Sequence, residues 1–192
     1  MAKVISSDGT GIAFDRAGQG PPLILVDGAL CSRSFGPMPK LAPLLTGHFT
    51  VFTYDRRGRG ESGDTQPYAV GREIEDIQAL IREAGAPAFL LGLSSGAALA
   101  AEAAARGLPV EALALYEPPY MVDPAAPRPP ADFEAQLRKL VAAGRRGDAV
   151  RLFMKVVGLP KFLIAVMRFF PMWPKLEAVA HTLAYDAAVR DG

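Results

Sequence analysis

The chain has 192 residues, of which 50% are hydrophobic and 21% charged, a composition typical of one globular domain with a substantial apolar core. Its net charge of +1 provides neither a basic field for nucleic acid nor an acidic tail. The lone cysteine, Cys31, excludes an internal disulfide and a cysteine-based metal cluster, which fits a reducing compartment. No signal-peptide pattern stands at the start, so we expect a cytoplasmic protein.

The first quarter of the chain predicts a hairpin followed by two buried strands. AKVISS and GIAFDRAG flank the turn sequence DGTG, which is typical of a β-hairpin. PPLILVDG is an apolar run without alternation, as expected of a strand that is covered on both faces. The proline-containing segment FGPMPKLAPLL predicts an irregular helix. FTVFTYD then predicts a second buried strand.

Two clear helices and two further strands follow. VGREIEDIQALIREAG places its isoleucines and Leu80 on one helical face and ends at Gly85. APAFLLGLS predicts a third strand, Ala97 to Arg106 a helix capped by Gly107, and VEALALYEPP a fourth strand. This alternation predicts an α/β fold with a mostly parallel sheet and helices on both faces.

The composition changes after the fourth strand. We expect a core over residues 1–119, a proline-rich linker over 120–130, and an all-helical cap or lid of three or four helices over 131–192. The longest apolar run, FLIAVMRFFPMW at 162–173, is too short to span a membrane and is interrupted by Arg168 and Pro171. It predicts a buried or partner-facing helix, with a membrane-surface helix as the alternative.

A serine stands where the third strand turns into a helix. Residues 92–96, GLSSG, match the pattern G-x-S-x-G, which in a strand-turn-helix setting holds the central serine in a strained backbone conformation. The positions two before and two after must be small because strand and helix approach closely there. The pattern therefore predicts that the hydroxyl of Ser94 stands at the carboxyl end of the sheet, beside the positive end of a helix.

Four segments together resemble the α/β-hydrolase family in order and spacing. They are VDGALCS at 26–32, YDRRGRGESG at 54–63, GLSSG at 92–96 and YEPP at 116–119, and the resemblance covers residues 4–119. It implies that Ser94 is the catalytic nucleophile and that the amides of Ser95 and Ala29 form the oxyanion hole. The family often has histidine where this chain has Asp27, and an anion there would oppose an oxyanion.

Residues 55–62 match the family's D-x-R-G-x-G-x-S turn, which we interpret as scaffold: a charged pair and glycines that fix a loop beside the serine. The glycines at 58, 60 and 63 also fit G-x-G-x-x-G, a dinucleotide-binding pattern. Because no helix is expected before about residue 70, the pattern does not open a helix as that fingerprint requires. Binding of NAD or FAD is therefore not favoured.

The base and acid of a catalytic triad are harder to place. The family's order is Ser, then Asp or Glu, then His. His48 precedes the serine, His181 lies in the expected cap, and Glu117 follows the fourth strand, where some family members have the acid. The resemblance implies that C-terminal strands carrying Asp and His are absent from this chain. A companion chain or a missing C-terminal segment would complete the sheet, and an uncovered edge would favour self-association.

The sequence thus predicts a serine hydrolase that cleaves carboxylic esters, lactones or thioesters through an acyl-enzyme and is weak or inactive as these 192 residues alone. The expected substrate is a small apolar acyl compound. No metal or organic cofactor, no nucleic acid and no membrane span are implied. The alternative is a catalytically inactive scaffold or a small-molecule-binding protein, which the missing histidine strand favours.

Overall fold

The structure is a computed structural model that describes residues 2–123, 125 and 128–190. They form two compact units, one up to Pro119 and the other from Tyr120 onward. Three residues of the expected linker (124, 126 and 127) and the last two of the expected cap lie outside the described residues. Within the described residues, every helix falls short of the length and apolarity that a bilayer crossing requires.

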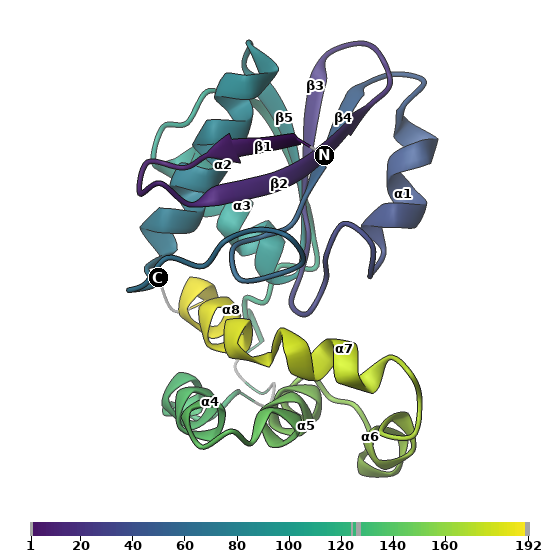
Figure 1. Ribbon diagram of the computed structural model, residues 1–192, viewed down its shortest axis with the longest axis vertical. Helices are drawn as coiled ribbons and strands as arrows, with labels where there is room; N and C mark the ends of the chain where they lie inside the picture. Colours follow the sequence, from purple (N-terminus) through teal and green to yellow (C-terminus); the bar gives the residue numbers. More distant parts are fainter. Residues whose placement is uncertain (1, 124, 126–127, 191–192) are drawn as a thin grey trace. The chain divides into compact units, whose positions relative to one another are not determined.

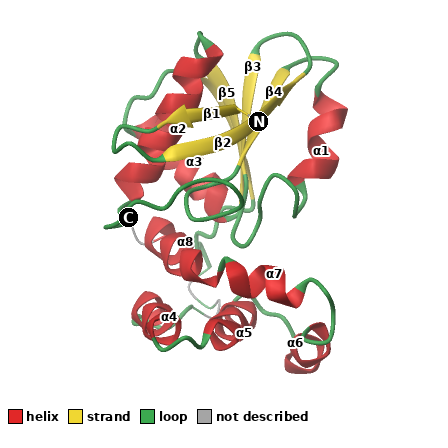
Figure 2. Cartoon of the chain, in the orientation of Figure 1, coloured by secondary structure: helices red, strands yellow, loops and turns green. Residues whose placement is uncertain are grey.

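The first unit is built on a six-stranded sheet with the order β1-β2-β4-β3-β5-β6 (Figures 1 and 2). The hairpin strands β1 and β2 are antiparallel to their neighbours, whereas β3 pairs in parallel with β4 and β5, and β5 pairs in parallel with β6. The predicted hairpin and the predicted α/β fold class are confirmed. The strands are β1 (Ala2–Ile5), β2 (Gly11–Ala17), β3 (Pro22–Val26), β4 (Thr50–Tyr54), β5 (Ala88–Leu93) and β6 (Val110–Tyr116).

Helices cover both faces of this sheet, as the alternation of elements predicts. Helix α1 (Met38–Leu45) lies on one face, and α2 (Val70–Ala84) and α3 (Ser95–Ala105) lie on the other (Figure 1). On the α1 side, Leu23 and Leu25 of β3 pack in one apolar cluster with Met38 and Val51. Because successive side chains of a strand alternate between faces, β3 supplies apolar groups to both layers.

The ends of α2 and α3 follow from specific backbone contacts. Gly85 ends α2 in the left-handed conformation with φ 74°, as expected for a glycine in this position. Helix α3 begins at Ser95, two residues earlier than the sequence predicts. The reason is that the carbonyl of Ser94 already accepts hydrogen bonds from the amides of Ala97 (2.9 Å) and Ala98 (3.3 Å). The serine is therefore the N-cap of α3.

Strand β6 is an edge strand, and most of its residues are exposed. Leu115 and Tyr116 retain 41% and 60% of their accessible surface. An apolar groove of about 470 Å³ runs beside β5 and β6. It is lined by Pro37, Met38, Leu41, Leu91, Leu93, Ala114, Leu115 and Tyr116.

The second unit is helical, with more and shorter helices than the three or four expected. Gly144 and Gly158 adopt positive φ where helices end. Pro160 and Pro174 stand at the starts of helices, and Pro171 lies in a turn between two helices. The apolar run splits into a short helix and a turn, with Ile164 buried and Phe169 90% exposed. The elements are α4 (Phe133–Ala142), α5 (Arg146–Val156), α6 (Lys161–Met167), α7 (Trp173–Ala178), η1 (Ala180–Thr182) and α8 (Leu183–Arg190).

Candidate active site

Ser94 occupies the turn between β5 and α3 in a conformation that side chains rarely adopt. Its φ is 54° and its ψ is −124°, and a non-glycine residue at positive φ stores strain unless its surroundings fix it. Here they do, because the Ser94 amide donates to the carbonyl of Tyr116 at 2.9 Å while its own carbonyl caps α3. The half-buried serine is thus held between the end of β6 and the start of α3.

The two glycines that flank this turn are required by close packing. A Cβ on Gly92 would lie 2.5 Å from the Cα of Ala97, and a Cβ on Gly96 would lie 2.5 Å from the carbonyl oxygen of Asp27. Real Cβ atoms essentially never approach other atoms this closely. The structure therefore explains why the pattern requires glycine two residues before and two residues after Ser94.

The loop after β3 lies against the same turn. A Cβ on Gly28 would lie 3.2 Å from both the Cβ of Ser94 and the carbonyl oxygen of Leu93. Ala29, which carries one of the expected oxyanion-hole amides, directly follows Gly28 and is half-buried. The next residue, Leu30, has a positive φ of 64°. The fold thus brings the loop that contains Ala29 to the turn that contains Ser94 and Ser95.

Asp27 is a buried carboxyl within this loop, with 4% of its surface exposed. Its Oδ1 accepts a hydrogen bond from the Gly28 amide at 2.8 Å. Burial raises the pKa of Asp27 to about 6, although the Gly28 amide, the Cys31 thiol and the charges of Arg59 and Arg56 act in the opposite direction. Asp27 is therefore a weaker acid than an ordinary aspartate, with a pKa of about 6.

Two buried arginines, to which the sequence patterns assign no individual role, contact the Asp27–Gly28 segment. Arg56 donates from Nη1 to the Asp27 carbonyl (3.3 Å) and to the Ser95 Oγ (3.2 Å), and Arg59 donates from Nη1 to the Gly28 carbonyl (2.6 Å). Each arginine is 1% exposed. No signal in the sequence marks their burial, because arginine is mostly an exposed residue and three arginines in a glycine-rich turn also suit a solvated loop.

Asp55 organises the turn that contains these arginines, as the scaffold interpretation predicts. Its carboxylate accepts hydrogen bonds from the Arg33 amide (2.8 Å), the Arg33 Nε (3.1 Å) and the Glu61 amide (3.0 Å). The charged partner therefore comes from the loop after β3 and not from the turn itself. The contact ties residues 55–61 to the segment that carries Ala29.

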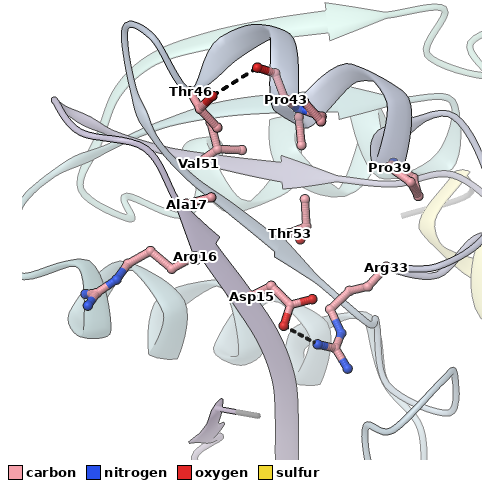
Figure 3. A pocket seen from close by; sticks show the side chains of 10 residues that line it. Asp15, Arg16, Ala17, Arg33, Pro39, Pro43, Thr46, Val51 and Thr53 are labelled. Carbon is pink, nitrogen blue, oxygen red and sulfur yellow. Dashed lines mark hydrogen bonds and ion pairs between the residues drawn. The ribbon is translucent and has the colours of Figure 1, made fainter.

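Arg33 also borders a hollow of about 450 Å³ between α1 and the strands β2 and β4 (Figure 3). There its Nη1 pairs with the exposed carboxylate of Asp15 at 2.8 Å. The lining residues are Asp15, Arg16, Ala17, Arg33, Pro39, Ala42, Pro43, Thr46, Val51 and Thr53.

The candidate bases and acids occupy different parts of the chain. His48 is exposed and lies just before β4, at the amino end of the parallel strands, whereas Ser94 follows the carboxyl end of β5. His48 is thus at the opposite edge of the sheet from the serine. His181 lies in η1 of the second unit, with its ring 6.3 Å from that of Tyr185. Glu117 is exposed, has φ 48° and directly follows Tyr116, the acceptor of the Ser94 amide.

This chain matches the sequence model of one protein family, and many solved structures are similar to it. The sequence model of the alpha/beta hydrolase family matches residues 23–191. An alpha/beta hydrolase from Sphaerobacter thermophilus is 57% identical, with a TM-score of 0.91 over 98% of this chain and 73% of that one. A hydrolase from Pseudomonas aeruginosa is 27% identical, with a TM-score of 0.70 over 99% of this chain and 72% of that one.

A third structure, a thermophilic esterase from Thermogutta terrifontis, is 23% identical and has a TM-score of 0.69 over 98% of this chain and 72% of that one. At this identity it shows the shared fold. All three solved proteins are longer than the chain described here, which spans about three quarters of each of them.

Proposed function

The chain belongs to the α/β-hydrolase family, and we propose that it is a serine hydrolase acting on carboxylic esters or related acyl compounds, lactones and thioesters among them, through an acyl-enzyme. The observation that carries this proposal is the strained backbone of Ser94, φ 54°, at the junction of β5 and α3. Holding a serine in such a conformation costs on the order of 1–3 kcal/mol, which favours a functional role for its hydroxyl over an incidental one.

In the proposed reaction, the Oγ of Ser94 attacks the acyl carbon and a tetrahedral intermediate forms. The amides of Ala29 and Ser95 donate to its negatively charged oxygen. Two features of the structure support this role: the Ala29 loop packs against the serine turn, and α3 directs its positive end toward that turn. Collapse of the intermediate expels the alcohol or thiol and leaves the acyl group on Ser94. Water then releases it as a carboxylic acid.

A base must take the proton of Ser94 and return it to the leaving group. We propose that the histidine and its orienting carboxylate come from residues outside this chain, on a C-terminal segment or a companion chain. The position of His48 at the far edge of the sheet supports this proposal, and so does the greater length of the solved relatives. These 192 residues alone would then have weak catalytic activity or none. The exposed apolar side chains of β6 would be covered by further strands that pair with it, or by self-association at this edge.

The substrate we propose is a small apolar acyl compound, and residues 131–192 would form a cap joined by the linker 120–130 to the core 1–119. Exposed aromatic and aliphatic side chains of the helical unit, such as Phe162 and Phe170, would suit apolar substrates. The alternative is an inactive scaffold that binds small molecules without cleaving them.

A fluorophosphonate probe distinguishes these functions. In the full-length protein, the probe should add its mass to Ser94, and Ser94→Ala should abolish both labelling and nearly all ester turnover. Ser7→Ala, a change at an exposed serine of the β1–β2 turn, is the matched control and should label normally. Absence of labelling in the folded full-length protein would favour the inactive scaffold, and labelling that persists in Ser94→Ala would exclude Ser94 as the nucleophile.

A further inference from the structure

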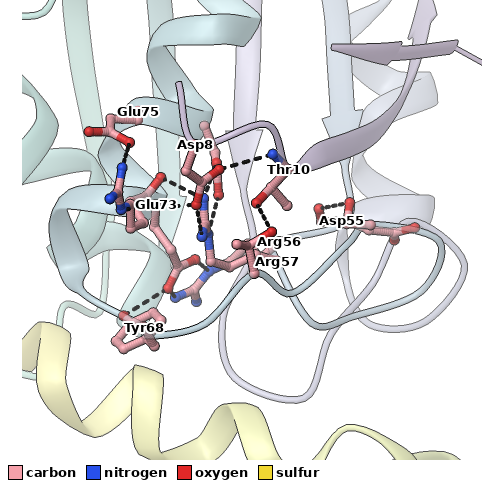
Figure 4. Close-up of polar contacts among 12 residues, drawn as sticks. Asp8, Thr10, Asp55, Arg56, Arg57, Tyr68, Glu73 and Glu75 are labelled. Carbon is pink, nitrogen blue, oxygen red and sulfur yellow. Dashed lines mark hydrogen bonds and ion pairs between the residues drawn. The ribbon is translucent and has the colours of Figure 1, made fainter. Parts of the chain in front are cut away.

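Arg56 and Arg57 are adjacent residues that are buried to the same extent and anchored in the same way (Figure 4). Each is 1% exposed, and each forms a bidentate ion pair with a carboxylate of α2. Arg56 binds Glu73 through Nε (2.7 Å) and Nη2 (2.8 Å), and Arg57 binds Asp76 through Nε (2.9 Å) and Nη2 (2.7 Å). Paired in this way, both guanidinium groups are tolerated in the interior.

The two arginines differ in what their remaining nitrogens contact. Nη1 of Arg57 donates to Asp8 in the β1–β2 turn at 2.9 Å, and its Nη2 also reaches the Arg72 carbonyl at 3.1 Å. Nη1 of Arg56 instead donates to the Asp27 carbonyl and the Ser95 hydroxyl. Arg56 therefore bridges the two segments that carry the proposed oxyanion-hole amides, and Arg57 joins the β1–β2 turn to α2.

Arg59 acts on the Ala29 amide more directly. Its Nη1 donates to the Gly28 carbonyl at 2.6 Å, and that carbonyl belongs to the same peptide group as the Ala29 amide. Because a peptide group is planar and trans, fixing the direction of its oxygen also fixes the direction of its N–H. A positively charged donor on the oxygen further polarises the group and strengthens the amide as a donor.

We propose that Arg56 and Arg59 are positioning residues of the oxyanion hole, which orient the amides of Ala29 and Ser95 through the Asp27 and Gly28 carbonyls and the Ser95 hydroxyl. The inference rests on the proposed function, because it assumes that these amides stabilise a developing oxyanion. It predicts that neither arginine touches the substrate. Their loss therefore affects the stability of the transition state much more than the binding of the substrate.

The test compares Arg56→Lys and Arg59→Lys with Arg57→Lys in the full-length protein, using a p-nitrophenyl ester. A lysine keeps the charge and cannot make the several directed contacts of a guanidinium. Both test variants should lower kcat by about 10- to 100-fold with KM changed by less than about 3-fold, since removal of a whole oxyanion donor costs about 100- to 1000-fold. Their affinity for a trifluoromethyl ketone, which forms a tetrahedral adduct, should fall in parallel with kcat/KM.

Arg57→Lys is the matched control for Arg56→Lys, because it weakens an ion pair of the same burial and geometry. It should lower the urea midpoint to a similar degree and leave kcat, normalised to the folded protein, within about 2-fold of the wild type. Should the lysine variants fail to fold, Arg59→Gln is the second variant: its uncharged amide sits on a shorter side chain that does not reach the Gly28 carbonyl as Nη1 does, and it should show the same selective loss of kcat.

Two results would overturn the inference: kcat of the Arg56 and Arg59 variants equal to that of Arg57→Lys, or a loss that appears entirely in KM. Ser94→Ala separates this failure from failure of the proposed function. If that variant is inactive and the arginine variants are fully active, the positioning role is wrong and the nucleophile assignment stands. If Ser94→Ala keeps its turnover, the proposed function is wrong as well.

Discussion

Gly28 packs against Ser94 so closely that a methyl group on Gly28 would lie 3.2 Å from the Cβ of the serine. The two residues are far apart in the sequence and belong to loops that follow neighbouring parallel strands, β3 and β5. Parallel strands end at the same edge of a sheet, so their loops meet there. This contact places the Ala29 loop beside the serine turn and makes the candidate site sensitive to small changes in the backbone.

Gly28→Ala should reduce catalysis much more than stability. The new methyl group forces Ser94 or the loop to shift by a few tenths of an ångström, and small misplacements of reacting groups are costly. We expect kcat/KM for an ester to fall by about 10-fold and the free energy of unfolding by no more than about 1 kcal/mol. Steady-state kinetics and urea denaturation of the full-length protein measure the two effects. Gly47→Ala, at a site with nothing within 4 Å, is the control, and equal activity of both variants would contradict the prediction.

Gly96→Ala should instead destabilise the protein. A Cβ at this position overlaps the Val26 carbonyl oxygen and lies 2.5 Å from that of Asp27, and both are backbone atoms that cannot move aside. We expect a loss of about 3 kcal/mol or more in the free energy of unfolding, measured by urea denaturation. Gly11→Ala in β2 is the comparison, because its Cβ would make ordinary contacts at 3.5 Å or more. A Gly96→Ala protein as stable as Gly11→Ala would mean that α3 can move away from β3.

Asp27→Asn should stabilise the protein at neutral pH and not at acidic pH. Burial raises the pKa of Asp27 to about 6, whereas the unfolded chain ionises near 3.9. The folded state therefore holds the proton more tightly, and this contribution to stability is complete below pH 3.9 and lost as pH rises through 6. A pKa difference of about two between the folded and the unfolded state corresponds to roughly 3 kcal/mol in the free energy of unfolding, which is an upper bound because the surroundings of the charge partly relax.

The variant carries a neutral amide in place of the carboxyl. The amount by which its free energy of unfolding exceeds that of the wild type should therefore rise between about pH 4 and 6 and stay constant above about pH 7. Urea denaturation at several pH values measures this difference. If Ala29 binds the oxyanion, Asp27→Asn should also raise kcat/KM a few-fold at pH 8, where the ionised Asp27 opposes the developing charge. A stability difference that is independent of pH would show that Asp27 does not titrate in this range.

Asp55→Asn should destabilise the protein without changing how its activity depends on pH. The Asp55 side chain is 3% exposed and pairs with Arg33, and weakening a buried charge pair costs about 2–4 kcal/mol. Because we assign Asp55 no proton transfer, the pH profile of kcat/KM should keep its shape. Asp15→Asn is the matched control: Asp15 pairs with the same arginine but is 63% exposed, so its loss should cost less than about 1 kcal/mol. A changed pH profile in Asp55→Asn would point to a catalytic carboxylate.

Local features of the sequence predicted the order and type of the elements of the first unit and the place of the serine at the strand-to-helix turn. Residues 70–85 show why: helical periodicity and an ending glycine are local properties, and the structure has α2 over Val70–Ala84 with Gly85 at positive φ. The G-x-S-x-G pattern is local in the same sense, because a tight strand-to-helix turn needs small residues at fixed spacings. The resemblance to hydrolases also followed from the order of four short segments.

The partners of the buried charges depend on how the loops are assembled in three dimensions. Asp55 pairs with Arg33 of another loop, and Arg56 bridges α2, the Asp27 loop and the serine turn. Such contacts join residues 17 to 39 positions apart, and a turn rich in arginine looks alike in sequence whether it is solvated or buried. Charged side chains carry no periodicity that marks their burial. Their environment is set by how the loops of parallel strands converge, and that is a property of the assembled sheet.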